Sequence, residues 1–131
     1  MFSLHQIKEA AGKVKSGADF PGYVQDLIKT GVTEYVTFVR DGHTVFFGEE
    51  DFSIQSEEKY DPMLVAANTD KEKFLHYLKD HQQGLTDFLT FCKRAAETGV
   101  DRWDVDMNDM TCTYYNKGGQ KILVENIPTA S

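Results

Sequence analysis

The chain has 131 residues, of which 40% are hydrophobic and 12% aromatic, and this predicts one folded domain with a core of its own. Its formal net charge is −7, and its 14 Lys and Arg residues are scattered, so the electrostatic footprint of a nucleic-acid-binding protein is missing. The apolar runs are too short to cross a bilayer, and the N-terminus does not resemble a secretory signal. We therefore expect a cytoplasmic protein that binds neither nucleic acid nor membrane.

Two helices are expected at the start of the chain. Apolar side chains recur at helical spacing over residues 3–16, and Ser16-Gly17 is expected to end that helix. A second helix is expected to begin at Asp19, with Pro21 in its first turn, where the missing backbone N–H does no harm. Gly31 is suited to the left-handed position just past the end of this second helix.

Three strands are expected to follow these helices. Residues 32–39 are β-branched and aromatic, with apolar side chains on both faces, which predicts an interior strand that is covered on both sides. Asp41-Gly42 predicts a two-residue type I′ turn, because glycine tolerates the positive φ that this turn requires. The chain then returns over residues 44–47, and residues 51–55 are read as a third strand.

The second half of the chain repeats this order after a polar connector. Thr69 and Glu72 are spaced as a capping box at the start of a helix that Gly84 ends. Four further elements and a tail are expected: a helix over residues 87–97, strands over residues 103–107, 111–115 and 120–125, and a loose tail over residues 127–131.

The two halves align without a gap when the sequence is shifted by 68 positions. Thr30-Gly31-Val32 then meets Thr98-Gly99-Val100, and aromatic residues meet aromatic residues. The aligned aromatic pairs are Phe20 and Phe88, Tyr23 and Phe91, Tyr35 and Trp103, Phe46 and Tyr114, and Phe47 and Tyr115. Similarity at a fixed offset indicates a repeated structural unit.

The repeat predicts an α+β fold in which a helix-helix-three-strand unit occurs twice. Within a single domain of residues 1–131, the boundaries are a first repeat at about residues 3–55, a connector at 56–68, a second repeat at about 70–126 and a tail at 127–131. Helices followed by hairpin-linked strands indicate an antiparallel sheet packed by helices. The two units are expected to share this sheet about a pseudo-twofold axis.

Asp104 and Asp106 form the most prominent acidic pair, and they are candidates for ligand binding. With Asn108 they copy the first three ligand positions of a calcium loop, but Asp109 stands where that loop needs glycine and Tyr115 where it needs glutamate. Their alternation with apolar residues favours a solvated polar face of a strand over a calcium site.

The sequence predicts no metal site and no cofactor. Cys92 and Cys112 lack the spacing of a metal-binding or redox pair, and the four histidines form no HxH or HxxxH pair. Gly118-Gly119 does not open a helix, so it is interpreted as a hairpin turn rather than a phosphate-binding loop.

His43 and Tyr60 are the other candidate ligand-binding residues. His43 follows the expected turn at Asp41-Gly42, where a histidine either bonds the turn or acts as a general base. No serine or cysteine nucleophile is near His43 in the sequence, so no catalytic residue is assigned. A site between the two halves would require His43, Tyr60, Asp104 and Asp106 to converge.

Two aromatic pairs on the return strands, Phe46-Phe47 and Tyr114-Tyr115, have two interpretations. One residue of each pair faces the core, because side chains alternate along a strand. The aromatic residues then either pack under a helix or at a dimer surface, or they form a wall of a ligand cleft between the halves.

Several segments match the pattern of a known bacterial family. They are Asp41 to Gly48 (DGHTVFFG), His81 to Gly84 (HQQG), Asp87-Phe88, Phe91 to Lys93 (FCK), Trp103-x-Val105-Asp106 and Met110 to Tyr115 (MTCTYY). Over nearly its whole length the chain resembles an uncharacterised family often named phage envelope protein, or YdfO-like. The resemblance implies a small α+β protein of bacterial genomes and prophage regions, and it implies no catalytic residue.

These observations leave three functional hypotheses. The first is a non-enzymatic binding or protein-interaction module, with an unidentified protein partner and a homodimer through a sheet edge. The second is a small-molecule-binding protein or small enzyme with a cleft between the two repeats. The third is a phage-derived inhibitor of a host protein, which the acidic surface permits.

Overall fold

The computed structural model describes residues 2–14 and 19–128. Its elements follow the order that the repeat predicts, and they confirm the α+β fold. The elements are α1 (Leu4–Ala11), α2 (Phe20–Thr30), β1 (Glu34–Phe38), β2 (Thr44–Phe47), β3 (Ser53–Gln55), α3 (Lys71–Gln82), α4 (Phe88–Glu97), β4 (Arg102–Asp106), β5 (Thr111–Tyr115) and β6 (Lys121–Asn126).

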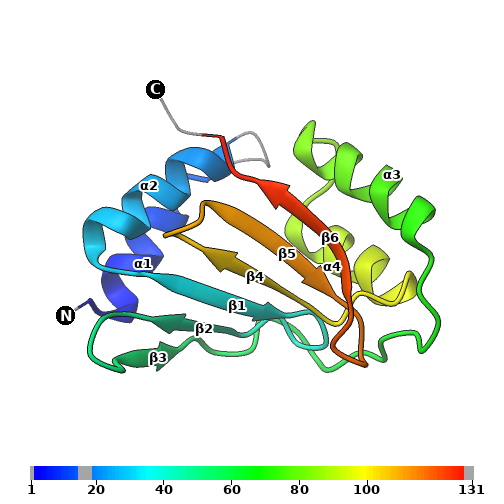
Figure 1. Ribbon diagram of the computed structural model, residues 1–131, viewed down its shortest axis with the longest axis horizontal. Coiled ribbons are helices and arrows are strands. Elements are labelled where there is room, and N and C mark those ends of the chain that lie inside the picture. Colours follow the sequence, from blue (N-terminus) through cyan, green and yellow to red (C-terminus); the bar gives the residue numbers. More distant parts are fainter. Residues whose placement is uncertain (1, 15–18, 129–131) are drawn as a thin grey trace.

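The strands form one antiparallel sheet in the order β3-β2-β1-β4-β5-β6. The helices form two pairs, with α1 and α2 toward one end of the molecule and α3 and α4 toward the other (Figure 1). Both pairs pack on the face that carries Tyr35 and Trp103, since Tyr23 of α2 contacts the first ring and Phe91 of α4 contacts the second. The opposite face, which carries Val36, Phe38, Asp104 and Asp106, is called the open face below.

The central pairing of β1 with β4 has a twofold-symmetric register. Val36 pairs with Asp104, which is 68 positions further along the chain. Tyr35 pairs with Val105, and Thr37 pairs with Trp103, so exchanging the strands at the same offset turns one pair into the other. This register fits the predicted pseudo-twofold axis, while a common origin of the two halves stays a prediction.

The expectation that the first strand is covered on both sides is wrong. Side chains along β1 alternate, with Tyr35 and Thr37 buried but Val36 and Phe38 partly exposed. Both helix pairs lie on the same side of the sheet, so β1 is interior to the sheet but covered on only one face.

The first helix is shorter than its apolar periodicity suggests. It ends at Ala11 with Gly12 as its C-cap. The amide groups of Lys13 and Val14 donate to carbonyl groups three residues earlier, the pattern of a tightened final turn. The predicted end at Ser16-Gly17 lies outside the described residues.

The loop between β1 and β2 is also not the predicted two-residue turn. It spans residues 39–43, with the amide of Phe38 donating to the carbonyl of His43 at 3.0 Å. A type I′ turn needs positive φ at both central residues, but only Gly42 has one, at +75°. The wider loop places the Asp41 side chain beneath His43, where the two groups bond.

Glycine ends both second helices, as predicted. Gly31 after α2 has a φ of 110° and Gly99 after α4 has a φ of 86°. A side chain at Gly99 would also meet the carbonyl oxygen of Asn68 at 2.5 Å, so the end of the connector packs directly against this glycine.

Some apolar residues of the helices are partly exposed, and part of the expected loose tail is buried. Ile28, Leu75 and Phe88 keep between 38% and 41% of their surface exposed. Ile127 is only 6% exposed, and its amide donates to the carbonyl of Met110 at 2.8 Å, which anchors the start of the tail. Residues 129–131 lie outside the described part of the chain.

The cap of α3 lies one residue later than the predicted capping box. The Asp70 carboxylate accepts a hydrogen bond from the Lys73 amide at 3.1 Å, and the Asp70 amide donates to the carbonyl of Thr98 at 2.9 Å. The helix therefore starts where the chain is already tied to the end of α4.

We expect Asp70→Ala to lower the free energy of unfolding by about 1 kcal/mol, because it removes the acceptor at the helix start. Thr69→Ala, the matched control, should change it by less than about 0.5 kcal/mol. Urea unfolding followed by circular dichroism measures both, and a larger loss in Thr69→Ala would contradict the observed cap.

Candidate functional site

A cleft of about 910 Å³ lies over the helix-covered face of the sheet. All four helices contribute to its walls, through side chains that include Ile7 of α1, Tyr23 of α2, His81 of α3 and Phe91 of α4. Its floor is formed by residues of β1, β2, β4 and β5: Tyr35, Thr37, Thr44, Phe46, Trp103, Cys112 and Tyr114. A cleft of this size can hold a small organic molecule.

Two groups of aromatic side chains line the cleft, one from each half of the chain. In the first half, the Tyr35 ring centroid lies 5.6 Å from that of Phe46 and 6.3 Å from that of Tyr23. In the second half, the rings centred within 6.3 Å of Trp103 belong to Phe88, Phe91 and Tyr114. Four of the five aromatic pairs that align at the 68-residue offset line the cleft, whereas Phe47 and Tyr115 lie on the opposite face.

The polar groups of the cleft floor carry no charge at neutral pH. The hydroxyl groups of Thr37 and Thr44 share a hydrogen bond of 2.8 Å. Burial raises the pKa of Tyr23 to about 12 and that of Cys112 to about 12. Burial likewise raises the pKa of the two other phenols, Tyr35 and Tyr114, well above the usual range. These phenols therefore stay protonated at neutral pH, and the Tyr114 hydroxyl group bonds the Cys112 thiol.

His81 contributes an unprotonated ring nitrogen to the α3 side of the cleft. Its ring stacks on Phe91 with centroids 4.4 Å apart, and its Nδ1 lies 3.1 Å from the carbonyl oxygen of Thr86. The Thr86 hydroxyl oxygen lies 3.0 Å from the same Nδ1. We assign the tautomer in which Nδ1 donates to the carbonyl, which only accepts, and this leaves Nε2 with a lone pair. Burial lowers the pKa of His81 despite the opposing effects of Thr86 and Asp87, so the neutral ring dominates at pH 7.

Glu125 contributes a carboxyl group to the same cleft. It stands opposite Cys112 in the pairing of β5 with β6, and its Oε1 accepts a hydrogen bond from Gln82 Nε2 at 3.1 Å. Burial raises the pKa of Glu125, and the Gln82 bond opposes that rise. Within the described residues no cationic side chain forms an ion pair with Glu125.

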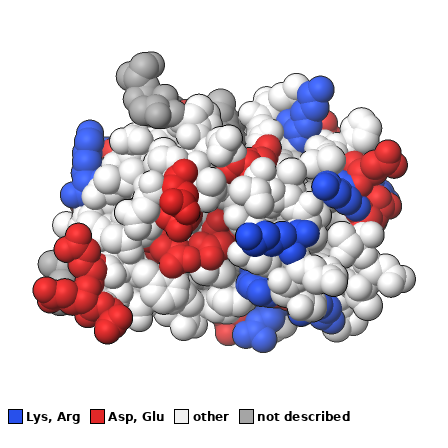
Figure 2. Space-filling view, viewed as in Figure 1, with Lys and Arg blue, Asp and Glu red and all other residues white. Residues whose placement is uncertain are grey.

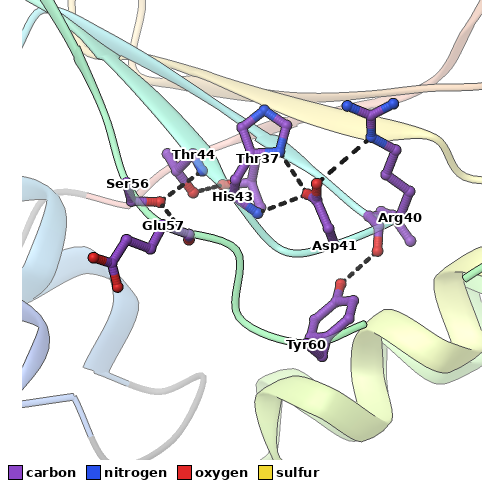
Figure 3. A network of polar contacts seen from close by, with 9 residues as sticks. Thr37, Arg40, Asp41, His43, Thr44, Ser56, Glu57 and Tyr60 are labelled. Atoms are coloured by element: carbon purple, nitrogen blue, oxygen red, sulfur yellow. Dashed lines mark hydrogen bonds and ion pairs between the residues drawn. The ribbon is translucent and has the colours of Figure 1, made fainter. Parts of the chain in front are cut away.

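His43 is held by Asp41 at the end of the β1–β2 loop (Figure 3). Asp41 Oδ1 accepts from the His43 amide at 3.0 Å and lies 2.5 Å from its ring Nδ1, while Arg40 Nε lies 3.7 Å from Oδ2. Burial alone would raise the pKa of Asp41, but the hydrogen bonds and charge of His43 outweigh it and lower that pKa. The His43 ring stacks on the Phe38 ring of the open face, with centroids 4.6 Å apart. This ring contact packs the β1–β2 loop against the open face.

Tyr60 lies in the connector and ties it to the end of β1. Its hydroxyl group donates to the carbonyl of Val39, and burial raises its pKa, with Cys92 of α4 adding to the rise (Figure 3). These contacts give Tyr60 a structural position between the sheet and α4.

Asp104 and Asp106 lie on the open face, and acidic side chains gather near the middle of the view in Figure 2. Asp106 Oδ1 accepts from the amides of Asn108 and Asp109 at 2.8 and 3.1 Å, so it caps the turn after β4. Asp104 Oδ1 is buried and has no hydrogen-bond partner within the described residues. Burial raises the pKa of Asp104 to about 7, with Glu34 and Asp106 adding to the rise.

The four residues predicted to bind a ligand do not meet in one place. His43 and Tyr60 lie on either side of the β1–β2 loop, whereas Asp104 and Asp106 lie along β4 on the open face. None of the four lines the cleft, and their role in binding stays a prediction.

Sequence reasoning assigned no role in a site to His81 or Glu125. Both line the cleft, and the aligned aromatic residues were the signal that could have located it. Across residues 2–14 and 19–128, no three His, Cys, Asp or Glu side chains are grouped so that they could hold a metal ion. No helix in the same ranges is long and apolar enough to span a membrane.

A family model described as "Protein of unknown function (DUF1398)" matches residues 8–126. The chain therefore belongs to this family of unknown function. No curated protein matches the sequence.

We expect Asp104 to make stability fall as pH rises. Its pKa is about 7 in the folded protein, against an ordinary value of 3.8 for this side chain, so between these values the folded state holds a proton that the unfolded state releases. Above pH 7 the ionised carboxylate is destabilising, and Asp104→Asn should then be more stable than the native chain by about 1 kcal/mol after solvent screening.

Urea unfolding at pH 4, 6 and 8 measures this difference, and at pH 4 the two proteins should differ little. Asp109→Asn, an exposed aspartate in the neighbouring turn, is the control and should show no such trend. A native chain that gains stability relative to Asp104→Asn between pH 4 and 8 would contradict the assignment.

Proposed function

We propose that this member of the DUF1398 family is a non-enzymatic binding protein that holds a small, largely aromatic molecule in the cleft between its two helix pairs. The observation that carries the proposal is the composition of the cleft. Aromatic rings from both halves line a space of about 910 Å³ above an uncharged floor.

Exposed aromatic surface in this cleft favours an occupant. Water in contact with apolar surface is unfavourable by roughly 25 cal/mol per Å². Phe88 at the cleft is 41% exposed although its ring contacts Trp103, so a ligand there would cover apolar surface that the fold itself leaves uncovered. Flat ligands gain further from stacking against the rings.

The cleft floor supports selectivity as well as affinity. The phenols of Tyr23 and Tyr35 and the hydroxyls of Thr37 and Thr44 line the cleft as neutral polar groups. Few well-placed polar groups in an apolar cleft fix the orientation of a ligand. We infer that the bound molecule carries a polar substituent that reaches this floor.

We also propose that the protein works in the bacterial cytoplasm and that its genes include prophage copies. The support is the resemblance to the phage-envelope-named family and the finding that no described helix could span a membrane. Fractionation of the native host, with the protein followed by an antibody, tests the location, and its recovery from the membrane pellet would contradict it.

A second proposal is a homodimer formed through the edge of the sheet. Its support is β6, a six-residue strand at the end of the sheet that pairs on one side only within the described chain. Sedimentation equilibrium at increasing concentration should show a doubling of mass, and a constant monomer mass to about 100 μM would contradict the dimer.

The cleft proposal is tested with Nile red, an uncharged dye that fluoresces strongly in apolar surroundings. Ala11 of α1 is exposed and lines the cleft, so Ala11→Trp should fill the space without disturbing the core. We expect the native protein to bind the dye and Ala11→Trp to weaken binding about tenfold or more, a loss of about 1.4 kcal/mol.

The matched control is Ala67→Trp, an exposed alanine of the connector that does not line the cleft. It should bind Nile red within about twofold of the native protein, because a substitution outside the cleft leaves the binding surface intact. If Ala11→Trp bound Nile red as tightly as the native protein does, the proposal would be contradicted.

A further inference from the structure

The α3 side of the cleft presents hydrogen-bond acceptors without matching donors. In the assigned tautomer of His81, Nδ1 donates to the carbonyl of Thr86 and Nε2 has a lone pair. No hydrogen bond to Nε2 is made by the described residues, and the ring lines the cleft. A ligand that donates an N–H or O–H group can satisfy this atom.

Glu125 is the second acceptor, and its charge lacks a counterpart. Gln82 bonds one carboxylate oxygen, which leaves the other free of any hydrogen bond from the described residues. The nearest paired residue across the sheet is Cys112, which stays neutral. A half-buried carboxylate without a cation is unfavourable, and a bound cation would offset that cost.

The same part of the fold links the two acceptors. His81 and Gln82 are neighbours in the last turn of α3, and Gln82 holds Glu125 while His81 stacks on Phe91. Asp87, which caps α4, also lines the cleft and adds a second carboxylate. All three groups therefore border one cleft.

The aromatic walls suit a positively charged group as well as a flat one. Phe88, Phe91, Trp103 and Tyr114 line this half of the cleft. Aromatic faces attract cations, most strongly when both are removed from water. An anionic ligand would instead face the carboxylates of Glu125 and Asp87.

Two exposed lysines also line the cleft. Lys8 belongs to α1 and Lys59 to the connector, and both are exposed. Neither forms an ion pair with Glu125 or Asp87 among the described residues. Each of these carboxylates accepts a hydrogen bond through one oxygen, from the Thr90 amide at Asp87 and from Gln82 at Glu125, and the proposal uses the other oxygen of Glu125.

Resting on the cleft-binding function proposed above, we infer that the ligand is an arylalkyl amine, with its nitrogen on a saturated carbon, whose protonated nitrogen is bound by Glu125 and His81 while its rings stack among Phe88, Phe91 and Trp103. The chemical class is an organic cation with an apolar, planar body. Asp87 adds to the attraction, and the phenols of the floor accept or donate to polar substituents.

Three probes that share one ring system and differ in charge test this inference. They are naphthalen-2-ylmethylamine, naphthalen-2-ylmethanol and 2-naphthoate, measured by isothermal titration calorimetry at pH 7.5. We expect the amine to bind about tenfold more tightly than the alcohol and the carboxylate to bind more weakly than both, as expected for one charged hydrogen bond.

Glu125→Gln should remove most of the preference for the amine and leave the affinity for the alcohol within about twofold. The substitution removes a charge that is unfavourable in the folded state, so we expect the variant to fold. Glu49→Gln, an exposed residue after β2 that does not line the cleft, loses the same charge and should keep the preference. His81→Phe keeps a ring to stack on Phe91 but loses Nε2, and it should also weaken the amine more than the alcohol.

The outcomes separate this inference from the function on which it rests. Equal binding of amine and alcohol to the native protein would overturn the inference, as would an equal loss of both in Glu125→Gln. If Nile red and the alcohol bind but the amine is not preferred, the cleft function stands and the ligand class is wrong. If neither Nile red nor any of the three probes binds, the cleft function fails and the inference fails with it.

Discussion

Five cross-strand pairs between β1 and β4 join the two halves of the sheet, from Glu34 opposite Asp106 to Phe38 opposite Arg102. Each half alone would be a three-stranded sheet with one helix pair and an open edge, a marginal arrangement in water. The antiparallel junction removes one edge from each half and carries both helix pairs to the same face. The position of the cleft depends on this junction, because Tyr35 and Thr37 on β1 and Trp103 on β4 form the middle of its floor.

Packing and binding place different demands on the same aromatic residues. Deep in each half, rings close the core: Phe74 is fully buried and contacts both Phe91 and Tyr114. At the cleft, Phe88 contacts Trp103 but keeps 41% of its surface exposed. A bound molecule would complete this packing, and in our account the fold supplies the apolar surface while His81 and Glu125 supply the selectivity.

The architecture was predictable because the local sequence signals for its elements are strong. Helix-ending glycines, strand periodicity and the 68-residue offset together indicated the α+β order of elements and the central axis.

The errors of the sequence analysis were local and had tertiary causes. Asp70 replaced Thr69 as the cap because its amide is also tied to the end of α4, and the β1–β2 loop widened because Asp41 bonds His43. The aromatic pairs on the return strands had two interpretations, packing or a wall of a cleft. Their spacing in the sequence does not show whether the rings pack against one another or leave a cleft between them. Glu125 carried no signal at all, because its importance comes from its neighbours Gln82 and Cys112 across the fold.

The central claim is that the cleft between the helix pairs is a binding site, and amide chemical-shift mapping tests it most directly. A ¹⁵N-labelled sample titrated with naphthalen-2-ylmethylamine should show saturable shifts at residues of the cleft, among them Tyr35, His81, Trp103 and Glu125. Residues of the open face whose sequence neighbours do not line the cleft, such as Asp106, should stay unchanged. Saturable shifts confined to the open face, or no saturable shifts at all, would contradict the account.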